Sequence, residues 1–219
     1  MGSTDLILAI CIITPLAMML FVFQGRSRVV LGFLLCGIFM CLLAGEINGL
    51  LLTLTGRTKY FMTVNITPVV EEVLKAVPIV FITFLLKPDR QFLLECSVAV
   101  GVGFAVLENA YILSTLRSVS VVWALVRGFG AGMTHGVCTL AVGCAMSFVY
   151  GKRKLFFPGS FAALSVAIIY HSIYNIIVQS PYSICGILLP IATYIPLMLI
   201  IYRRKAAAAP TESPERIES

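Results

Sequence analysis

Charged residues are scarce in this chain. Asp, Glu, Lys and Arg make up 12% of its 219 residues, whereas apolar residues make up 59% and the mean hydropathy is +1.00. Soluble domains contain about 25% charged and about 45–50% apolar residues. The shortage of charge excludes an ordinary soluble fold. It indicates an all-α, polytopic transmembrane helical bundle, because helices satisfy their own backbone hydrogen bonds inside a bilayer.

The sequence also lacks the marks of several other protein classes. Its seven cysteines include no Cys-x-x-Cys pair, so they predict neither a disulfide framework nor a zinc knuckle. No basic segment precedes the first apolar run and no small-residue cleavage site follows it, so we expect no cleavable signal peptide. The net charge of +6 comes mainly from basic loops, and we therefore expect no nucleic-acid partner.

Apolar runs long enough to cross about 30 Å of hydrocarbon recur along most of the chain. The segment 118–128 is apolar but contains Arg127, and it is either a short interfacial helix or an eighth, partial span. We expect residues 1–202 to form one transmembrane domain and the tail 203–219, rich in Ala, Pro, Ser and Glu, to be disordered. The seven predicted spans are 5–23, 29–54, 63–86, 91–113, 129–150, 156–178 and 181–202.

The basic residues are unevenly divided between the predicted loops. Ten lie in the connections between spans one and two, three and four, and five and six, or after the seventh span, and four lie on the opposite side. Cytoplasmic loops carry an excess of Lys and Arg. We therefore expect the N-terminus outside and the C-terminus in the cytoplasm. The ten are Arg26, Arg28, Lys87, Arg90, Lys152, Arg153, Lys154, Arg203, Arg204 and Lys205, and the four are Arg57, Lys59, Arg117 and Arg127.

The stretch 67–78 places two adjacent carboxylates and a lysine inside an apolar run. A charge at the centre of a bilayer costs roughly 2.5–3.5 kcal/mol on insertion scales, so such residues face the protein interior or water and usually mark function. Lys75 follows Glu71 and Glu72 at helical spacing and can reach either carboxylate. We expect it to neutralise one acid and to leave the other free. On this segment alone, the alternative is a structural ion pair without chemistry.

Other predicted spans also carry polar residues. The two histidines of the chain both lie in spans, and His171 shares a helix face with Asn175. His135 lies in a run of glycines with small-xxx-small spacing, which predicts a tight helix contact. The remaining polar pairs are Glu108 with Asn109 in span four, and Glu46 with Asn48 in span two. We interpret the second pair as a helix-packing pair, with lining of the same cavity as the alternative.

The predicted topology brings these residues to a common depth. At 1.5 Å per residue, the two acids of span three, Glu108, His135 and His171 all fall roughly 8–13 Å below the outer surface. Structural polar groups scattered through a bundle would have no reason to agree in depth. We therefore expect four helices to contribute to a single site.

The residue types at this depth suit hydrolysis. Glu108, His135 and His171 match the two-histidine, one-carboxylate set of hydrolytic zinc sites, which leaves one position for water. Zinc lowers the pKa of that water, and Glu71 or Glu72 is the candidate base, with Lys75 pairing the other glutamate. Asn175 is a candidate hydrogen-bond donor to an oxyanion. A metal-free mechanism, in which glutamate and histidine activate water, stays open.

Four short motifs in this order resemble a known family. Glu71-Glu72-x-x-Lys75, Phe104-x-x-x-Glu108-Asn109, a single histidine, and His171-x-x-x-Asn175 together resemble the PrsW intramembrane proteases, over residues 63–178. The larger group includes the CAAX prenyl endopeptidases and bacterial immunity-type proteases. The CAAX pattern has a histidine in place of Glu108 and an arginine one residue beyond the position of Lys75, so the PrsW branch is favoured.

The resemblance implies a multi-pass peptidase of the bacterial plasma membrane. Its substrates would be membrane-anchored proteins, including anti-sigma factors, cut on the extracytoplasmic side. The depth estimate from loop charges independently places the site near that side. The other hypotheses are an ion-coupled transporter that uses the buried acids, a CAAX-type endopeptidase, and a membrane scaffold or immunity factor with a relict site. Transporters often contain internal repeats, and none is evident here. Substrate identity and oligomeric state do not follow from the sequence.

Overall fold

The computed structural model describes residues 3–116 and 118–208. All regular structure within these ranges is helical, so the all-α prediction is confirmed. The elements are α1 (Ser3–Val22), α2 (Gly25–Thr55), α3 (Lys59–Phe61), η1 (Met62–Ile66), α4 (Thr67–Leu85), α5 (Arg90–Thr115), α6 (Val121–Leu125), η2 (Val126–Ala131), α7 (Gly132–Val149), α8 (Arg153–Val178), η3 (Ser183–Ile187) and α9 (Leu188–Ala208).

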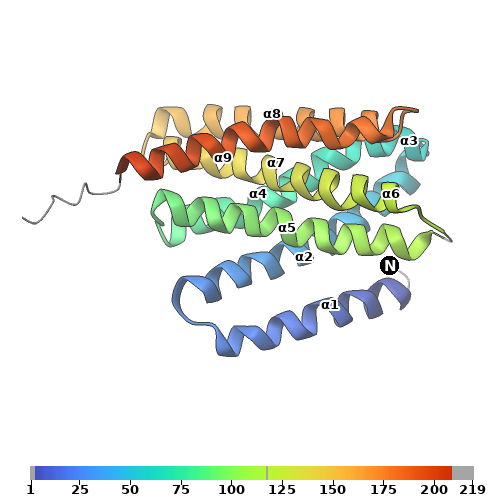
Figure 1. Cartoon of the computed structure of the whole chain (residues 1–219), viewed down its shortest axis with the longest axis horizontal. Coiled ribbons are helices and arrows are strands. Elements are labelled where there is room, and N and C mark those ends of the chain that lie inside the picture. The colour runs from blue at the N-terminus through green and yellow to red at the C-terminus, as the bar shows by residue number, and fades with distance from the viewer. Residues whose placement is uncertain (1–2, 117, 209–219) are drawn as a thin grey trace, which may run out of the picture.

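The long helices lie side by side, and successive connections alternate between the two ends of the bundle (Figure 1). Helix α5 is central and packs against α2, α4 and α7. Helix α8 covers α7 and α4 on the far side, whereas α1 lies at one edge, on α2 and α5. This arrangement surrounds α4 and α7 with other helices, and these two carry most of the polar residues of interest.

Within residues 3–116 and 118–208, four helices are long and apolar enough to cross a membrane. They are Gly25–Thr55, Arg90–Thr115, Val121–Val149 and Lys154–Val178. Two shorter apolar helices, Leu6–Val22 and Ser183–Leu199, flank them, and α4 has 19 residues that include three charges. A multi-pass membrane protein is therefore supported, and the count of seven spans stays a prediction.

The segment 118–128 is not a separate span. Helix α6, the π-helical η2 and α7 form one continuous apolar helix, Val121–Val149. The fifth predicted span thus begins eight residues before the expected 129. The physical reason is that no proline interrupts this run, and a π-helical stretch allows the helix to continue through a local irregularity. Arg127 lies within η2 and its side chain is largely buried, so it is not a loop residue.

The predicted disordered tail begins too early. Helix α9 continues to Ala208, six residues into the segment 203–219. Arginine, lysine and alanine are strong helix formers, and they favour extending the helix beyond the apolar run. Residues 209–219 lie outside the described part of the chain.

Close helix approaches depend on the glycines of α2 and α5. A Cβ added at Gly103 would lie 2.0 Å from the carbonyl oxygen of Leu34, and one at Gly37 would lie 2.1 Å from that of Val100. Gly101 abuts α7 in the same way, since its Cβ would lie 2.5 Å from the carbonyl oxygen of His135. Gly101 and Gly103 thus allow α5 to approach two neighbouring helices closely.

His135 lies at a tight helix contact as predicted, but the glycines with small-xxx-small spacing around it do not make that contact. A Cβ added at Gly128, Gly132 or Gly136 would meet nothing within 4 Å. The backbone of His135 is instead approached closely by Gly101 of the neighbouring helix. The small-xxx-small pattern identifies a face that permits close packing, but which face is used depends on the neighbouring helices.

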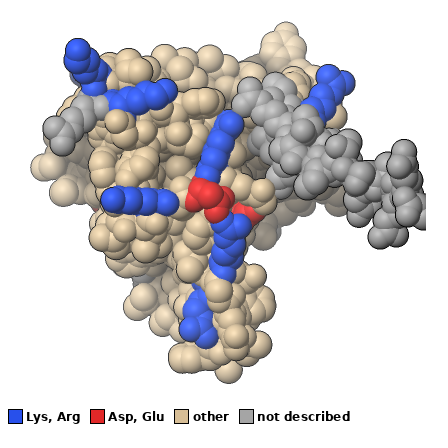
Figure 2. Space-filling view, turned by 90° about the vertical axis from the view of Figure 1, so that its left-hand side faces the viewer, with Lys and Arg blue, Asp and Glu red and all other residues tan. Residues whose placement is uncertain are grey.

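Basic side chains gather at one end of the bundle. Figure 2 views the end that carries the α1–α2, α4–α5 and α7–α8 connections, and Lys and Arg are spread across it around a small acidic group. Arg26 forms an ion pair with Asp89, whose side chain also caps α5 by accepting a hydrogen bond from the Phe92 N–H. The distribution agrees with the predicted cytoplasmic side, and the orientation of the chain stays a prediction.

The glycine contacts generate a stability prediction. We expect Gly103→Ala to cost about 1–3 kcal/mol, because α2 and α5 must separate to admit the methyl group. Gly132→Ala is the matched control: its Cβ has open space, and alanine favours a helix over glycine by up to about 1 kcal/mol. Thermal unfolding in detergent checks both variants. Equal midpoints would show that the α2–α5 contact can relax without cost.

Candidate active site

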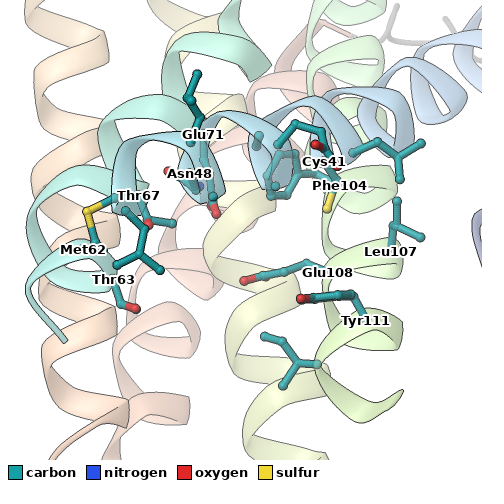
Figure 3. A pocket seen from close by; sticks show the side chains of 18 of the residues that line it. Cys41, Asn48, Met62, Thr63, Thr67, Glu71, Phe104, Leu107, Glu108 and Tyr111 are labelled. Carbon is teal, nitrogen blue, oxygen red and sulfur yellow. The ribbon is translucent and has the colours of Figure 1, made fainter. Parts of the chain in front are cut away.

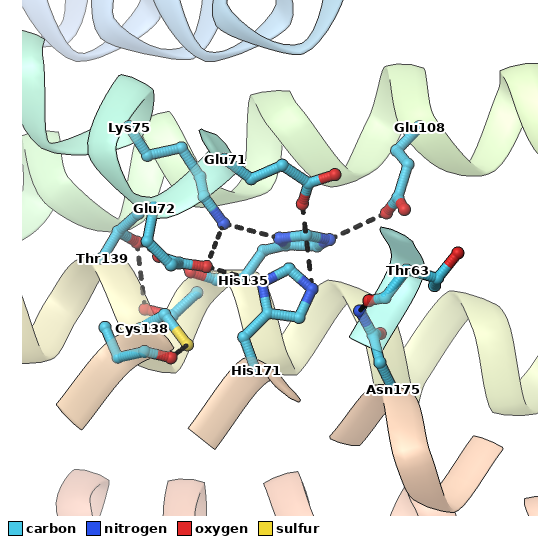
Figure 4. Close-up of polar contacts among 12 residues, drawn as sticks. Thr63, Glu71, Glu72, Lys75, Glu108, His135, Cys138, Thr139, His171 and Asn175 are labelled. Carbon is cyan, nitrogen blue, oxygen red and sulfur yellow. Dashed lines mark hydrogen bonds and ion pairs between the residues drawn. The ribbon is translucent and has the colours of Figure 1, made fainter. Parts of the chain in front are cut away.

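Four helices contribute to a buried polar cluster in the bundle (Figure 4). Helix α4 supplies three of its members, and its first turn contains Pro68, a position where the missing N–H costs no helical hydrogen bond. Helix α5 supplies Glu108, α7 supplies His135, and α8 supplies His171 and Asn175. The three members from α4 are Glu71, Glu72 and Lys75.

Lys75 lies at the centre of this cluster and is fully buried. Its Nζ donates to Glu72 Oε1 at 2.6 Å and lies 2.8 Å from His135 Nδ1. The same nitrogen lies 4.7 Å from the centroid of the Phe104 ring, a cation–π distance. The expected pairing of Lys75 with one acid of α4 is confirmed, and the partner is Glu72.

The lysine fixes the hydrogen bonding of His135. A lysine ammonium can only donate, so a neutral His135 accepts at Nδ1 and donates its Nε2–H to Glu108. The distance from His135 Nε2 to Glu108 Oε2 is 2.8 Å. His135 is thereby held from both sides of its ring, with Lys75 on one side and Glu108 on the other.

His171 is oriented by Glu72. Its Nδ1 lies 2.7 Å from Glu72 Oε1, and a carboxylate can only accept, so Nδ1 carries the hydrogen. The other ring nitrogen, Nε2, then presents a lone pair, and it lies 3.8 Å from Glu71 Oε2. A carboxylate that holds the far nitrogen of a histidine is the usual outer partner of a metal-binding imidazole.

Glu71 is the one acid of this cluster with no cation in contact. Lys75 pairs with Glu72, and Arg127 lies 3.2 Å from Glu108. Glu71 is buried, and its Oε2 has no hydrogen-bond partner. An unsatisfied carboxylate oxygen is costly in a low-dielectric interior. Its position therefore calls for a bound proton, a water molecule or a metal ion.

Glu71, His135 and His171 could hold a metal ion together. One donor atom from each lies within 4.8 Å of the others, and all three residues are buried. The donor set of two imidazoles and a carboxylate suits a hydrolytic zinc site, and the orphaned oxygen of Glu71 fits such a role. The group differs by one member from the predicted set, since Glu71 stands where the sequence suggested Glu108. Glu108 contacts His135 instead.

Arg127 lies beside this cluster, a position that its sequence context does not predict. It lies in η2, pairs with Glu108, and is 14% exposed. Its Nη2 lies 3.2 Å from Glu108 Oε2 in this ion pair, and its Nε has no hydrogen-bond partner. The signal that could have found it was an arginine within an apolar run, eight residues before His135. The distribution of basic residues predicted instead that Arg127 lies on the outer side of the membrane.

Asn175 ties α8 to the segment before the acids. Its Nδ2 donates to the carbonyl oxygen of Thr63 in η1 at 2.9 Å. On the other side, Asn109 donates to the carbonyl oxygen of Arg127 in η2 at 3.3 Å. Both π-helical segments thus directly precede a helix that carries site residues, and π-helical turns are frequent at functional sites. The role of Asn175 as an oxyanion donor stays a prediction.

The central ion pair generates a second stability prediction. We expect Lys75→Met to cost about 3–5 kcal/mol, because Glu72 is left as an uncompensated buried charge. The double variant Lys75→Met/Glu72→Gln should recover much of this loss, and exposed Lys59→Met should change stability by less than about 0.5 kcal/mol. SDS titration of the purified protein measures all three. A double variant no more stable than Lys75→Met would show that the unpaired carboxylate is not the cause.

Comparison with known protein families identifies the family of this chain. The model of the family described as PrsW family intramembrane metalloprotease matches residues 25–202, which is most of the chain and includes every residue of the site. No curated protein and no solved structure matches the chain. The family match confirms the resemblance drawn from the four short motifs. The chain therefore belongs to the PrsW family of intramembrane metalloproteases, and it is a membrane-embedded peptidase.

Proposed function

We propose that this chain hydrolyses a peptide bond of a membrane-anchored protein, of the anti-sigma-factor type, near the extracytoplasmic face of a bacterial plasma membrane. The observation that carries the proposal is the buried cluster in which Glu71, His135 and His171 bring donor atoms within 4.8 Å of one another. A site of this kind inside a bundle of apolar helices has access to substrates that share the bilayer.

The proposed placement has seven spans, with the N-terminus outside and the C-terminus in the cytoplasm. Residues 1–202 form the catalytic domain. The alternating connections support this placement (Figure 1). So does the basic end, since exposed Arg26, Arg28, Lys87, Arg90, Lys152 and Lys154 all lie in or beside its connections. The burial of Arg127 removes one cation from the opposite side and so strengthens the bias.

Glu71, His135 and His171 would hold zinc, and His135 would then offer a ring nitrogen to the metal in place of one of its two hydrogen bonds. When bound there, zinc supplies a Lewis acid that activates water and polarises the scissile carbonyl. Neighbouring side chains orient the ligands. Glu72 orients His171 through a hydrogen bond to Nδ1, and Lys75 contacts both Glu72 and His135. The sequence pattern suggested Glu108 as the ligand and Glu71 or Glu72 as the base, whereas here Glu71 is the proposed ligand. Measurement of bound metal in variants distinguishes the two assignments.

Glu108 is the proposed general base. It is 20% exposed, in contrast to the nearly inaccessible Glu72, and Arg127 and His135 contact its Oε2. Water adds to the carbonyl carbon as its proton passes to Glu108 Oε1. The C–N bond then breaks as Glu108 returns that proton to the leaving nitrogen, which yields a carboxyl and an amine terminus. Asn175 would donate to the oxyanion with the amide hydrogen that Thr63 does not use.

Removal of the base should abolish cleavage without unfolding the protein. We expect Glu108→Gln to lower the rate of cleavage by about 10²–10⁴-fold, the usual contribution of general acid–base catalysis. Glu95→Gln is the matched control on the same helix, because Glu95 pairs with Gln91 away from the site. Mass spectrometry of new termini in membranes that contain each variant measures the activity. Full activity of a folded Glu108→Gln protein would overturn the assignment.

Metal content tests the ligand set independently of activity. We expect elemental mass spectrometry to find about one zinc per wild-type chain. Three protein ligands would hold it and leave the fourth position for water. His171→Ala and Glu71→Gln should lose the metal, whereas Glu108→Gln should retain it. Loss of zinc from Glu108→Gln with retention in Glu71→Gln would restore the ligand set suggested by the sequence. An active wild-type protein without metal would indicate the glutamate–histidine mechanism.

A further inference from the structure

A cavity of about 810 Å³ opens beside the catalytic cluster (Figure 3). Its walls come from the second half of α2, from η1 with the start of α4, and from the second half of α5. Glu71 and Glu108 both lie on its wall, so it reaches the reacting groups directly. The volume is in the range of ligand-binding cavities, about 300–1,000 Å³.

The wall formed by α2 contains the motif 44–49, whose sequence favours a helix-packing pair and leaves cavity lining as the alternative. Its polar residues Glu46 and Asn48 line the cavity, in agreement with that alternative. Gly45 and Gly49 lie one helical turn apart and also line it. A Cβ added at either glycine would meet nothing within 4 Å. These glycines therefore do not serve helix contact, and their lack of side chains keeps the cavity wide.

Asn48 offers an unused hydrogen-bond acceptor in this wall. Its Oδ1 is inaccessible and has no hydrogen-bond partner. Thr53, Thr63 and Thr67 add hydroxyl oxygens to the cavity lining. Buried polar atoms in native proteins are nearly always paired. A chain segment that brought its own backbone N–H groups into the cavity would give Asn48 Oδ1 a partner once the amide turned toward the cavity, and would donate to threonine hydroxyls that now only donate, as Thr53 and Thr63 do.

A substrate segment must expose its scissile carbonyl, which an intact helix keeps hydrogen-bonded. Unwinding in hydrocarbon leaves backbone groups unpaired, at several kcal/mol each. A cavity with polar walls next to the catalytic groups removes this penalty. The cavity therefore bears on the backbone conformation of the bound substrate as well as on its position.

We propose that this cavity binds the substrate's transmembrane segment in an unwound, extended conformation, with the Asn48 amide turning toward the cavity to accept a backbone N–H and Gly45 and Gly49 providing clearance. The proposal rests on the proposed peptidase function. It implies a substrate class: single-span proteins whose apolar segment is interrupted by helix-breaking residues in its outer third. A continuous Leu/Ala helix would not enter the cavity.

The test uses two synthetic single-span peptides in proteoliposomes with the full-length protein. One peptide has Gly-Pro in the outer third of its apolar segment, the other has a continuous Leu/Ala segment, and each carries a photoreactive residue at that depth. We expect the interrupted peptide to crosslink to residues 44–53 of Glu108→Gln protein, with at least tenfold less crosslinking of the continuous peptide. Crosslinks mainly outside the cavity, or equal labelling by both peptides, would overturn the proposal.

Variants of the α2 wall provide the second readout. Gly49→Leu fills the cavity and should reduce crosslinking, and raise KM for cleavage, at least tenfold, while zinc content and the thermal midpoint stay unchanged. Asn48→Leu should raise KM by up to about tenfold, the value of one neutral hydrogen bond. Gly32→Leu is the control, because Gly32 lies on α2 in open space and outside the cavity.

The outcomes separate the two proposals. Crosslinking in the cavity that Gly49→Leu abolishes, without cleavage by the wild type, would support the binding cavity and contradict the peptidase assignment. Cleavage that Gly49→Leu and Gly32→Leu leave equally intact would overturn the cavity and leave the peptidase assignment standing. An equal loss in both variants would also count against the cavity, because the effect would then not be specific to its wall.

Discussion

The structure depends on the burial of one lysine among helices. Lys75 is fully buried and contacts both Glu72 and His135, so it connects α4 with α7 through charge. A bilayer offers no water to solvate such a group, and it therefore has to be paired within the protein. The pairing also determines the chemistry: it commits Glu72 to a positioning role and leaves Glu71 without a cation. The orphaned carboxylate and two oriented imidazoles are what a hydrolytic site requires.

The backbone supports this arrangement through contacts outside the site. Gly101 brings α5 against the backbone of His135, and Gly37 and Gly103 bring α2 against α5. The two π-helical segments, η1 and η2, precede α4 and α7 and are held by Asn175 and Asn109. Close helix packing and side-chain-to-backbone hydrogen bonds thus bring residues up to 104 positions apart, from Glu71 to Asn175, into one cluster.

The same constraint explains why the site has one open side. Lys75, His135 and His171 are enclosed by helices, whereas Glu71 and Glu108 reach the cavity beside α2. Water and a peptide segment can therefore approach the reacting carboxylates without exposing the central ion pair. A protease in a membrane must admit water to hydrolyse a bond and yet keep lipid away from its charges. An enclosed charge network with a polar cavity on one side meets both requirements.

The sequence by itself determined the all-helical membrane class and most members of the buried polar cluster. Apolar runs identified the bundle, and acids, a lysine and two histidines inside those runs identified the cluster, because charge in a bilayer is too costly to be retained without a role. Only the tertiary structure decided the pairings. In that structure Lys75 pairs with Glu72 and not with Glu71, Arg127 pairs with Glu108, and Asn48 lies on the wall of the cavity. Helical spacing allows Lys75 to reach either acid, and a loop count cannot tell a buried arginine from an exposed one. Such choices follow from the rotation and approach of neighbouring helices, which depend on contacts between residues far apart in the chain.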